Sequence, residues 1–560
     1  MKQSMIKSIK KLISNLDYEI LDGELSDFEI NKLCYDSRIV ENDDLFICLK
    51  GARFDTHSII PDIIKKGAKV IIVDKDSEYV AEGSHSSPVR CVEESTASPT
   101  VGASSANPTV GASSASPIVE ESTASPTVGA SSASPIVGAS YTSPVILAVE
   151  NTRIALAIIS ANYFDRPADK LKIVGITGTK GKTTTAFMIR NILKEAGHKV
   201  GMIGTIGIFY GDEHVITDNT TPESFVLQEY FRKMLDMGID YVVMEVSSQS
   251  LKYHRVYGIN FYYAVFTNIM PEHIGEHEHT DYNDYLESKL KIFEQCENAL
   301  INAGTNDYDR VIRKIKGLAE LAHTNGASSQ AVGASCTSPQ SVGASCASPQ
   351  NVGASCTSSQ TVGASCVSPK LYEKKINRKF NLRIPGEHNL ENASLAYEFG
   401  KSLGLSDNII IRALEETVVP GRIEEVYRDD DFTVIVDFSY EDNGAKRLFD
   451  VLRKENYKRI VAVFGCGGNR SKNRRYGMGE LCGKEADFIV LTADNSRFEK
   501  TRDIIRDIES TLTKYKKEND LENGYVIIED RYKAIEYAIA NRKKGDVICV
   551  MGKGHELLWK

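Results

Sequence analysis

The amino-acid sequence predicts an α/β protein of three domains with two low-complexity insertions. Short apolar runs of strand length alternate with helical patterns along most of the chain, which is typical of parallel sheets covered by helices. Two tracts of short repeats interrupt this alternation, and removing them from the 560 residues leaves enough chain for three domains of roughly 150 residues each. A Gly-rich turn between a strand and a helix, at residues 177–182, marks the central domain.

The expected domains follow the chain in order. Residues 1–168 form the first, residues 169–419 form a central domain with a P-loop-type nucleotide-binding sheet, and residues 420–560 form a Rossmann-like, doubly wound sheet. Strands of the first domain are expected at Leu45–Leu49 and Val70–Val73. The strands expected in the third domain are 433–438, 459–464, 487–492, 525–528 and 546–551.

Both insertions consist of near-identical units. Residues 92–145 are nine-residue units, and the insertion at 325–370 contains units of ten residues from 332 onward. Their Ser, Ala, Gly and Thr side chains offer little apolar surface to offset the entropy of ordering, so both are predicted to be disordered. An adhesive or spacer function is one interpretation. Tolerated expansion of two surface loops is favoured, because long surface loops cost little stability.

The composition indicates which partners and which cellular location to expect. The net charge is −9, with acidic and basic residues well mixed, which argues against a nucleic-acid partner. No apolar run approaches the roughly 18 residues of a membrane-spanning helix, and residues 1–16 lack the apolar core of a signal peptide. Four of the eleven cysteines belong to the second repeat, and the others show no paired metal spacing. We therefore expect a cytoplasmic protein without membrane insertion.

The Gly-rich turn has the features of a phosphate-binding loop. An apolar strand at 172–177 leads into it, and helical periodicity begins after it. Unpaired N–H groups at a helix N-terminus favour anions, Lys182 adds charge for the β- and γ-phosphates, and the Thr183 hydroxyl can bind Mg²⁺. Ile176 stands where the full P-loop pattern has its first glycine. A strand–turn–helix without a ligand is the alternative.

A second buried strand ends in an acid. Tyr241–Val246 is almost wholly apolar except for Glu245. A buried carboxylate without a cation is costly, so we expect Glu245 to meet the Mg²⁺ held by Thr183. A structural acid paired with another side chain is the alternative.

The polar stretch Glu272–His279 comes soon after the predicted strand Ala264–Ile269. A zinc site is one interpretation, whereas hard-cation chemistry with phosphates suits the context better. For His277 and His279, a solvated loop is the favoured interpretation.

Other polar motifs occur in the first and third domains. Tyr35–Arg38 is a weak signal, because Asp-Ser-Arg is equally typical of a turn or a helix cap. In the third domain the polar residues follow the carboxyl ends of strands, where open α/β sheets bind ligands. They are Asp437, Gly465–Arg470, Asp494–Arg497 and Gly552–Glu556.

Taken together, these motifs resemble those of the Mur ligase superfamily, over essentially the whole chain outside the repeats. The resemblance implies a UDP-sugar-binding domain, then an ATP-binding ligase domain, then an amino-acid-binding domain. It implies that ATP is bound by Gly178, Thr179, Lys180, Gly181, Lys182, Thr183 and Thr184.

The resemblance also assigns substrate-binding residues. It places Tyr35, Ser37 and the segment Ala52–Phe54 near the uridine nucleotide. The residues implied for a muramoyl dipeptide are Asn219, Thr220, Thr221, Ser247, Tyr253 and Arg255. Those implied for the incoming amino acid are Arg470, Asp494, Asn495, Ser496, Arg497, Gly552 and Glu556.

Catalytic and metal-binding roles follow from the same resemblance. It implies Lys182, Glu245, His273 and Lys289 as catalytic residues, and Thr183, Glu245, His273 and Lys289 as magnesium ligands. Lys289 matches the lysine that the family carbamylates with CO₂, so that a cation becomes an anionic ligand. From the sequence alone, a solvent-facing helix lysine would be the interpretation of Lys289.

The implied activity is that of an ATP-dependent acid–amino-acid ligase, of EC 6.3.2 type, in peptidoglycan synthesis. The substrate would be UDP-N-acetylmuramoyl-L-alanyl-D-glutamate, and the added third residue a diamino acid, with meso-diaminopimelate expected. The dipeptide carboxylate would attack the γ-phosphate of ATP to form an acyl phosphate, which the amine then attacks. A monomer is expected.

The chain departs from the family pattern at several positions. Gln249 replaces a histidine, and Tyr440 ends the sequence Phe-Ser-Tyr where the family has Tyr-Ala-His. Glu272 replaces an aspartate, Asn469 replaces an acidic residue, and Ser496 replaces a proline. The chain also stops soon after Glu556. These departures leave open a paralogue with another acceptor, such as L-lysine or a folylpolyglutamate- or cyanophycin-type substrate. A nucleotide-binding scaffold without catalysis is a further alternative.

Overall fold

The computed structural model describes residues 6–51, 54–81, 143–275, 278–318, 370–374, 380–455 and 457–553. The chain divides into two compact units. One takes the described parts of Tyr18–Ser26 and Ile30–Glu150, and the other those of Met1–Asp17, Asp27–Glu29 and Asn151–Lys560. The domain boundaries at 168 and 419 stay predictions, as does the disorder of most of the repeats. The last residues of the two tracts, Val145 and Lys370, begin strands β7 (Val145–Val149) and β15 (Lys370–Lys374), so for them the expectation of disorder is wrong. Nearly all of both repeat tracts lies outside the described residues.

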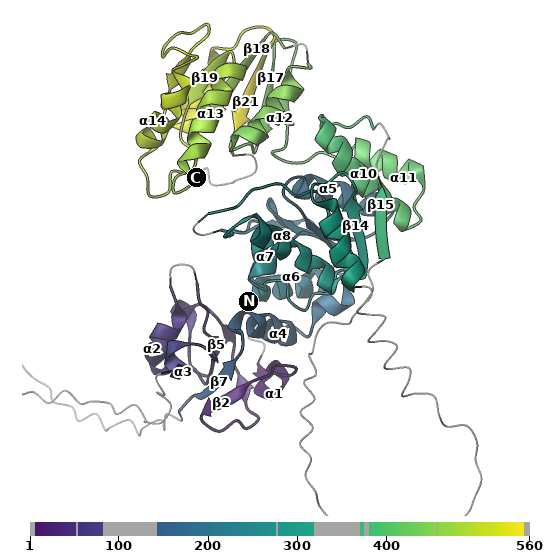
Figure 1. The fold of residues 1–560 in the computed structure, drawn as a ribbon, viewed down its shortest axis with the longest axis vertical. Coiled ribbons are helices and arrows are strands. Elements are labelled where there is room, and N and C mark those ends of the chain that lie inside the picture. Colours follow the sequence, from purple (N-terminus) through teal and green to yellow (C-terminus); the bar gives the residue numbers. More distant parts are fainter. Residues whose placement is uncertain are drawn as a thin grey trace, which may run out of the picture. The chain divides into compact units, whose positions relative to one another are not determined.

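A five-stranded sheet forms the smaller unit (Figure 1). Its order is β2 (Glu19–Asp22), β7 (Val145–Val149), β6 (Val70–Asp74), β5 (Leu45–Ile47) and β4 (Leu33–Cys34). All neighbouring strands are parallel except β2 and β7. Helix α2 (Ile60–Lys65) packs on the sheet through Ile60 and Ile63. Short elements complete the N-terminal region: β1 (Lys7–Ser8), α1 (Ile9–Leu12), β3 (Glu29–Ile30) and α3 (Glu78–Ala81).

An eight-stranded sheet forms the centre of the larger unit. Its order is β11 (Glu213–Val215), β10 (Gly207–Tyr210), β9 (Val200–Gly204), β12 (Tyr241–Glu245), β8 (Lys172–Thr177), β13 (Tyr263–Phe266), β14 (Asn298–Asn302) and β15 (Lys370–Lys374). The strands from β9 to β15 in this order are parallel, and β10 and β11 add an antiparallel edge. The carboxyl ends of β8, β12 and β13 therefore meet at one edge of the sheet.

Helices cover both faces of this sheet. On one face α5 (Lys182–Glu195) packs with α10 (Glu387–Ser402) and α11 (Asp407–Glu415) around an apolar cluster that includes Ile189 and Phe399. On the other face α6 (Ser224–Asp236) and α8 (Tyr282–Leu290) contribute Phe231 and Tyr285. Helices α4 (Thr152–Tyr163) and α7 (Ser248–Lys252) also belong to this part, and residues 308–318 are helical. Burial on both faces explains why these strands read as continuous apolar runs.

The C-terminal part is a six-stranded sheet with helices on both faces. Its order is β16 (Glu424–Arg428), β17 (Phe432–Asp437), β21 (Asp546–Met551), β18 (Arg459–Phe464), β19 (Phe488–Leu491) and β20 (Tyr525–Ile527). Only the pair β16–β17 is antiparallel. One face carries α12 (Asp442–Leu452), α13 (Lys472–Glu485) and α14 (Thr501–Leu512), and the other carries α15 (Arg531–Ala540). The predicted α/β fold with a doubly wound C-terminal sheet is confirmed.

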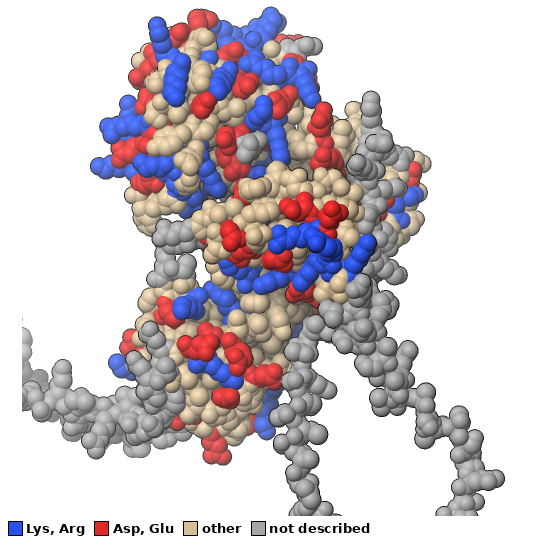
Figure 2. All heavy atoms as spheres, viewed as in Figure 1, with Lys and Arg blue, Asp and Glu red and all other residues tan. Residues whose placement is uncertain are grey.

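The distribution of surface charge and the hydropathy of the helices agree with the composition of the sequence. Figure 2 shows basic and acidic side chains intermixed over the visible face of the molecule. None of the helices in the described residues is long and apolar enough to cross a membrane.

Candidate functional site

The Gly-rich turn connects β8 to α5, as the sequence predicted. Gly178 and Gly181 have φ values of 144° and 85°, a region that favours glycine. A Cβ on Gly178 would lie 2.0 Å from Thr267 Oγ1, and one on Gly181 would lie 2.3 Å from Asn392 Oδ1. Both glycines are therefore required by backbone conformation and by close packing.

Two residues after β13 clamp this loop. Asn268 Oδ1 accepts a hydrogen bond from the Lys180 backbone N–H at 2.9 Å, and its Nδ2 donates to the Lys180 carbonyl at 3.1 Å. The Thr267 hydroxyl donates to the same carbonyl at 2.6 Å. Sequence reasoning missed this clamp. A polar pair directly after a buried strand was the signal that could have revealed it.

The N-terminus of α5 has no side-chain cap. Gly181 occupies the N-cap position without a side-chain cap, so the first backbone N–H groups of a 14-residue helix have no capping partner. Lys182 Nζ donates to the carbonyls of Gly178 and Thr179 at 2.9 and 3.1 Å. Burial lowers the pKa of Lys182. All seven residues predicted for ATP, from Gly178 to Thr184, lie in this turn or in the first turn of α5.

Glu245 ends β12 beside the first turn of α5 and is completely buried. The Thr183 hydroxyl donates to its Oε2 at 2.9 Å, and the backbone N–H of Thr205 donates to its Oε1 at 2.8 Å. The Thr205 hydroxyl also contacts Oε2, at 3.1 Å. A carboxylate and two hydroxyls are the hard oxygen donors that Mg²⁺ prefers, so these residues fit that ion.

Lys289 is buried in α8, with 1% of its surface exposed. Its Nζ donates to the Gly178 carbonyl at 2.9 Å and lies 4.7 Å from the centre of the Tyr285 ring. Burial, together with the positive charge of Lys182, lowers the pKa of Lys289 well below the usual value for lysine. The interpretation as a solvent-facing helix lysine is therefore wrong. A buried amine without its proton is a nucleophile.

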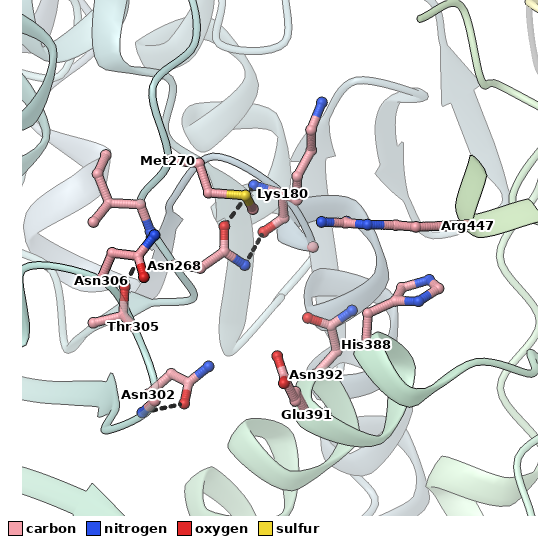
Figure 3. Close-up of a pocket in the computed structure, with 13 residues that line it drawn as sticks. Lys180, Asn268, Met270, Asn302, Thr305, Asn306, His388, Glu391, Asn392 and Arg447 are labelled. Carbon is pink, nitrogen blue, oxygen red and sulfur yellow. Dashed lines mark hydrogen bonds between the residues drawn. The ribbon is translucent and has the colours of Figure 1, made fainter. Parts of the chain in front are cut away.

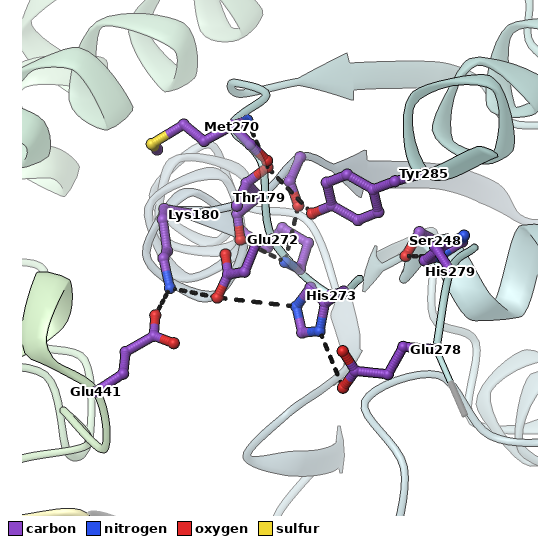
Figure 4. Close-up of polar contacts among 12 residues, drawn as sticks. Thr179, Lys180, Ser248, Met270, Glu272, His273, Glu278, His279, Tyr285 and Glu441 are labelled. Carbon is purple, nitrogen blue, oxygen red and sulfur yellow. Dashed lines mark hydrogen bonds and ion pairs between the residues drawn. The ribbon is translucent and has the colours of Figure 1, made fainter. Parts of the chain in front are cut away.

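His273 lies in a chain of polar contacts next to the loop (Figure 4). Its Nε2 is 4.0 Å from Glu272 Oε1, and its Nδ1 is 3.7 Å from Glu278 Oε1. Within the described part of the chain, no three His, Cys, Asp or Glu side chains gather as a metal site. The structure thus joins Thr183 to Glu245 but pairs His273 with two other carboxylates.

The expectation for His279 was wrong. Its side chain is fully buried, with Nε2 2.9 Å from Ser248 Oγ and Nδ1 3.2 Å from Asp284 Oδ2. The ring also packs at 5.1 Å against Tyr285. The loop turns this histidine inward to join α7 and α8, which local polarity could not reveal. His277 lies outside the described residues.

Lys180 in the loop holds two carboxylates at once. Its Nζ lies 2.8 Å from Glu272 Oε1 and also contacts Glu441, just before α12 (Figure 4). Although burial opposes it, the negative charge of these carboxylates raises the pKa of Lys180. A phosphate that approached Lys180 would compete with these two acids.

The residues predicted for the dipeptide lie beside Glu245. The Thr221 hydroxyl donates to the Glu245 carbonyl at 2.9 Å and accepts from the Ser247 N–H at 3.0 Å. Arg255 Nη1 donates to the Thr221 carbonyl at 3.2 Å. Thr220 contacts Thr205 at 3.1 Å, Asn219 is exposed, and Tyr253 lies under the Arg153 guanidinium. Tyr35 and Ser37, predicted for the uridine nucleotide, are half-buried in the smaller unit, and Ala52 and Arg53 lie outside the described residues.

The residues predicted for the incoming amino acid follow β18, β19 and β21. Burial lowers the pKa of Arg470, and the positive charges of Arg497 and Arg474 lower it further. A Cβ on Gly552 would lie 3.1 Å from Asp494 Oδ2, so these two positions adjoin. Asn495 is exposed and Ser496 is hydrogen-bonded to Thr501. Glu556 lies outside the described residues.

A pocket of about 180 Å³ opens beside Lys180 and Gly181 (Figure 3). Further residues that line it are Asn268, Asn302, Asn306, His388, Glu391, Asn392 and Arg447. Burial, and secondarily the charge of Arg447, lowers the pKa of His388 to about 4, so its ring is neutral at pH 7. Sequence reasoning missed this pocket, because its walls come from five separate segments.

Three family models match successive parts of the chain. They are the Mur ligase family catalytic domain at residues 29–103, the Mur ligase middle domain at 176–399 and the Mur ligase glutamate ligase domain at 421–554. Over 554 residues the chain is 32% identical to the UDP-N-acetylmuramoyl-L-alanyl-D-glutamate–2,6-diaminopimelate ligase of Clostridium perfringens. The aligned region covers 98% of this chain and 94% of the relative. The chain belongs to the Mur ligase family.

Other relatives agree with this family. The ligase of the same name from Caldanaerobacter subterraneus is 33% identical over 530 residues, covering 94% of this Mur ligase and 90% of the relative. A solved structure of a UDP-N-acetylmuramoyl-L-alanyl-D-glutamate–2,6-diaminopimelate ligase matches with a TM-score of 0.54 at 18% identity, over 98% of this chain and 94% of that one. A MurF structure from Acinetobacter baumannii matches with a TM-score of 0.53 at 15% identity, over 98% and 96%. At such identities these structures show the shared fold.

Because the chain belongs to the Mur ligase family, the class of reaction it catalyses follows from the family. It is an ATP-dependent ligase, and the predicted family resemblance is confirmed. The alternative of a nucleotide-binding scaffold without catalysis is thereby disfavoured. The roles of individual residues rest on the geometry described above.

Proposed function

We propose that this Mur ligase joins meso-diaminopimelate to UDP-N-acetylmuramoyl-L-alanyl-D-glutamate in peptidoglycan synthesis, as a cytoplasmic monomer. Two relatives with about one third of their residues identical carry this activity in their names. The observation that carries the choice of acceptor is the convergence of Arg470 and Arg497 at the ends of neighbouring strands. Two adjacent cations suit a substrate carboxylate, which would compete for Arg470 with Glu278, whose Oε1 lies 4.0 Å from Arg470 Nη1.

The dipeptide carboxylate and ATP would meet between the Gly-rich turn that follows β8 and the carboxyl end of β12. Thr221, Ser247 and Arg255 are grouped there beside Glu245 and would hold the dipeptide. The uncapped N-terminus of α5 and Lys182 would hold the β- and γ-phosphates. A carboxylate oxygen attacks the γ-phosphorus, the bond to ADP breaks, and an acyl phosphate forms.

The second step makes the amide bond. The amine of the amino acid attacks the acyl carbon, its proton leaves, and inorganic phosphate departs from the tetrahedral intermediate. Asp494 and Gly552 lie where they can meet the ammonium end of the amino acid, and Arg470 and Arg497 where they can bind its second carboxylate. The protein contributes mainly by positioning groups and neutralising charge.

We assign the magnesium site to Thr183 and Glu245, with His273 and a carbamate on Lys289 as further ligands. Bound Mg²⁺ would neutralise charge on the transferred phosphoryl group. The lowered pKa of Lys289 supports carbamylation, because only the neutral amine attacks CO₂. The N–C bond forms, one C–O π bond of CO₂ opens, the nitrogen loses one proton, and the neutral buried amine becomes an anionic carbamate.

We assign the pocket beside Gly181 to the nucleoside of ATP. It adjoins the phosphate loop, and amide side chains from Asn302 and Asn306 can donate to and accept from a base. The neutral His388 and the side chain of Arg447 offer flat surfaces for stacking.

One assay tests the whole proposal. ATP turnover would be measured with the UDP-muramoyl dipeptide against a panel of amino acids that includes meso-diaminopimelate, L-lysine and L-glutamate. We expect turnover that requires both the dipeptide and meso-diaminopimelate. Preference for another amino acid would overturn the acceptor, and turnover independent of the dipeptide would overturn the ligase substrate.

A further inference from the structure

Two loops carry the residues assigned to the incoming amino acid, and they touch each other. We call residues 465–470, after β18, the first acceptor loop, and residues 494–499, after β19, the second. The Gly468 N–H donates to the Asn495 carbonyl at 2.8 Å, and a Cβ on Gly468 would lie 2.0 Å from the Ser496 carbonyl oxygen. The relative placement of Arg470 and Arg497 therefore depends on how these loops are held together.

Each loop contains a residue with a left-handed backbone. Asn469, next to Arg470, has a φ of 52°, and Arg497 itself has a φ of 51°. Side chains other than glycine take this conformation at a cost, so surrounding contacts must maintain it. Contacts between the two loops converge on Glu499: the Asn469 N–H donates to Glu499 Oε1, and the Phe498 N–H next to Glu499 donates to Asn469 Oδ1 at 3.3 Å.

We propose that Arg475, a buried residue of α13, positions both acceptor loops and so determines the affinity for the amino acid. Arg475 is 1% exposed. Its Nη1 and Nη2 donate to the two carboxylate oxygens of Glu499 at 2.9 and 2.7 Å, and Nη2 also contacts the Gly467 carbonyl at 3.4 Å. One guanidinium thus reaches the second loop through Glu499 and the first through Gly467.

The same guanidinium ties the loops to the helices. Arg475 Nη1 donates to Asp507 Oδ2 at 2.8 Å, which connects α13 to α14; these two helices lie side by side (Figure 1). Hydrogen bonding to Arg475 lowers the pKa of Glu499 to about 2, so this carboxylate stays ionised at neutral pH. Only a planar fork can serve these partners together, because a lysine ammonium cannot bind a carboxylate bidentately and reach a second loop.

Arg475 is a positioning residue, and a KM–kcat comparison tests this role. In Arg475→Lys we expect the KM for the amino acid to rise about tenfold or more, because a small displacement of binding groups weakens their contacts, while the KM values for ATP and the dipeptide stay within about twofold. The matched control is Arg459→Lys. Arg459 pairs bidentately with Asp546 at the opposite end of the same sheet, where β18 and β21 begin.

The control separates positioning from stability. Both lysine variants remove a bidentate pair, so their thermal midpoints should fall by similar amounts, whereas only Arg475→Lys should change the KM for the amino acid. An unchanged KM in folded Arg475→Lys would overturn the proposal. An equal rise in both variants would overturn it as well.

The two acidic partners of Arg475 provide a second test. Glu499→Gln weakens the contact of Arg475 with the second acceptor loop and keeps an oxygen that can accept from the Asn469 N–H, whereas Asp507→Asn weakens the contacts of Asp507 with Arg475 and Lys472. We expect Glu499→Gln to reproduce the KM rise of Arg475→Lys and Asp507→Asn to leave the KM near the wild-type value. The same rise in both would mean that Arg475 only joins the helices, which overturns the proposal.

The inference rests on the proposed function, but the two can fail separately. All KM values are measured with whichever amino acid the wild-type enzyme uses in the panel. A wild-type preference for L-lysine would overturn the proposed acceptor and leave the Arg475 comparison intact. Turnover by the wild type with no amino acid at all would overturn both.

Discussion

At the scale of single residues, burial separates the functional ionisable groups from ordinary surface charges. A buried charge is costly unless a partner offsets the loss of hydration. Glu245 has two threonines as partners, and Lys180 has two carboxylates. Lys289 lies at the loop against the Gly178 carbonyl and the Tyr285 ring, and burial together with the charge of Lys182 lowers its pKa. Such a lysine is suited to modification.

Replacement of Lys289 tests the carbamate directly. We expect Lys289→Ala to lose nearly all ligase activity, because the variant lacks the proposed anionic ligand. Added acetate or another short carboxylate should restore part of the activity, measured as phosphate release. Lys291→Ala serves as control, since Lys291 follows α8 and carries no assigned role. A fully active Lys289→Ala variant would contradict the assignment.

Lys289 should also make stability depend on pH when CO₂ is removed. Burial holds the pKa of Lys289 in the folded protein well below the usual value for lysine. Between the two values the unfolded chain binds more protons than the folded chain, so stability rises with pH across this window. We expect the thermal midpoint of the wild type, relative to Lys289→Met, to rise from about pH 7 toward about pH 10 in CO₂-depleted buffer. A difference that falls with pH would count against this.

Arg497 should discriminate between amino acids. L-lysine lacks the second carboxylate of meso-diaminopimelate and would leave Arg497 unpaired, which costs about 2 kcal/mol, or roughly thirtyfold in specificity. We expect Arg497→Ala to reduce the ratio of kcat/KM for meso-diaminopimelate over L-lysine by about that factor. Arg506→Ala is the control, because Arg506 is exposed and pairs with Asp503 on α14. A ratio that Arg497→Ala leaves unchanged would defeat the assignment.

At the scale of elements, the phosphate loop depends on a second strand. The turn between β8 and α5 has the composition of a phosphate site, yet Thr267 and Asn268 after β13 fix its shape from outside. Strand pairing places β13 next to β8 in parallel, so the two carboxyl ends are held at the same height. The loop is thereby preorganised before ATP arrives.

Removal of the clamp should weaken ATP binding. In Asn268→Ala both hydrogen bonds to Lys180 are lost, each worth about 1 kcal/mol, so we expect the KM for ATP to rise by up to roughly thirtyfold. Asn298→Ala is the matched control: Asn298 donates to the Tyr262 carbonyl at 2.8 Å, at the start of β14. A rise of similar size in the control, or none in Asn268→Ala, would show that the clamp does not shape the ATP site.

At the scale of the whole molecule, the repeat tracts interrupt two sheets just before a strand. Val145, the last residue of the first tract, begins β7, and Lys370, the last of the second, begins β15. β7 lies between β2 and β6 and is buried. The strands that follow the tracts are therefore part of the fold, whereas the tracts have few side chains with which to build a core.

A double deletion tests whether the tracts are dispensable. We expect removal of 92–142 and 332–369 together to leave soluble yield, thermal midpoint and ligase activity largely unchanged, because loop length has a small effect on stability. Removal of 92–149 is the control, since it also deletes β7 and should prevent folding of the smaller unit. A collapse in yield or midpoint on deleting either tract alone would refute dispensability.

The sequence by itself determined the α/β class, the phosphate loop and the acid at the end of β12. These features depend on local patterns: apolar runs of strand length, a glycine turn, and one acid within an apolar strand. The resemblance of its motifs supplied the residues of the candidate site and the ligase activity, which composition and spacing could not supply.

Only the tertiary structure decided which polar side chains are buried and what they touch. Lys289 contacts the carbonyl of Gly178, 111 positions earlier, and the Lys180 backbone is held by Asn268, 88 positions away. His279 is turned inward, and Arg475 lies between the two acceptor loops. The physical reason is that burial and pKa depend on neighbours brought together by strand order and helix packing, and such neighbours leave no local signal in the chain.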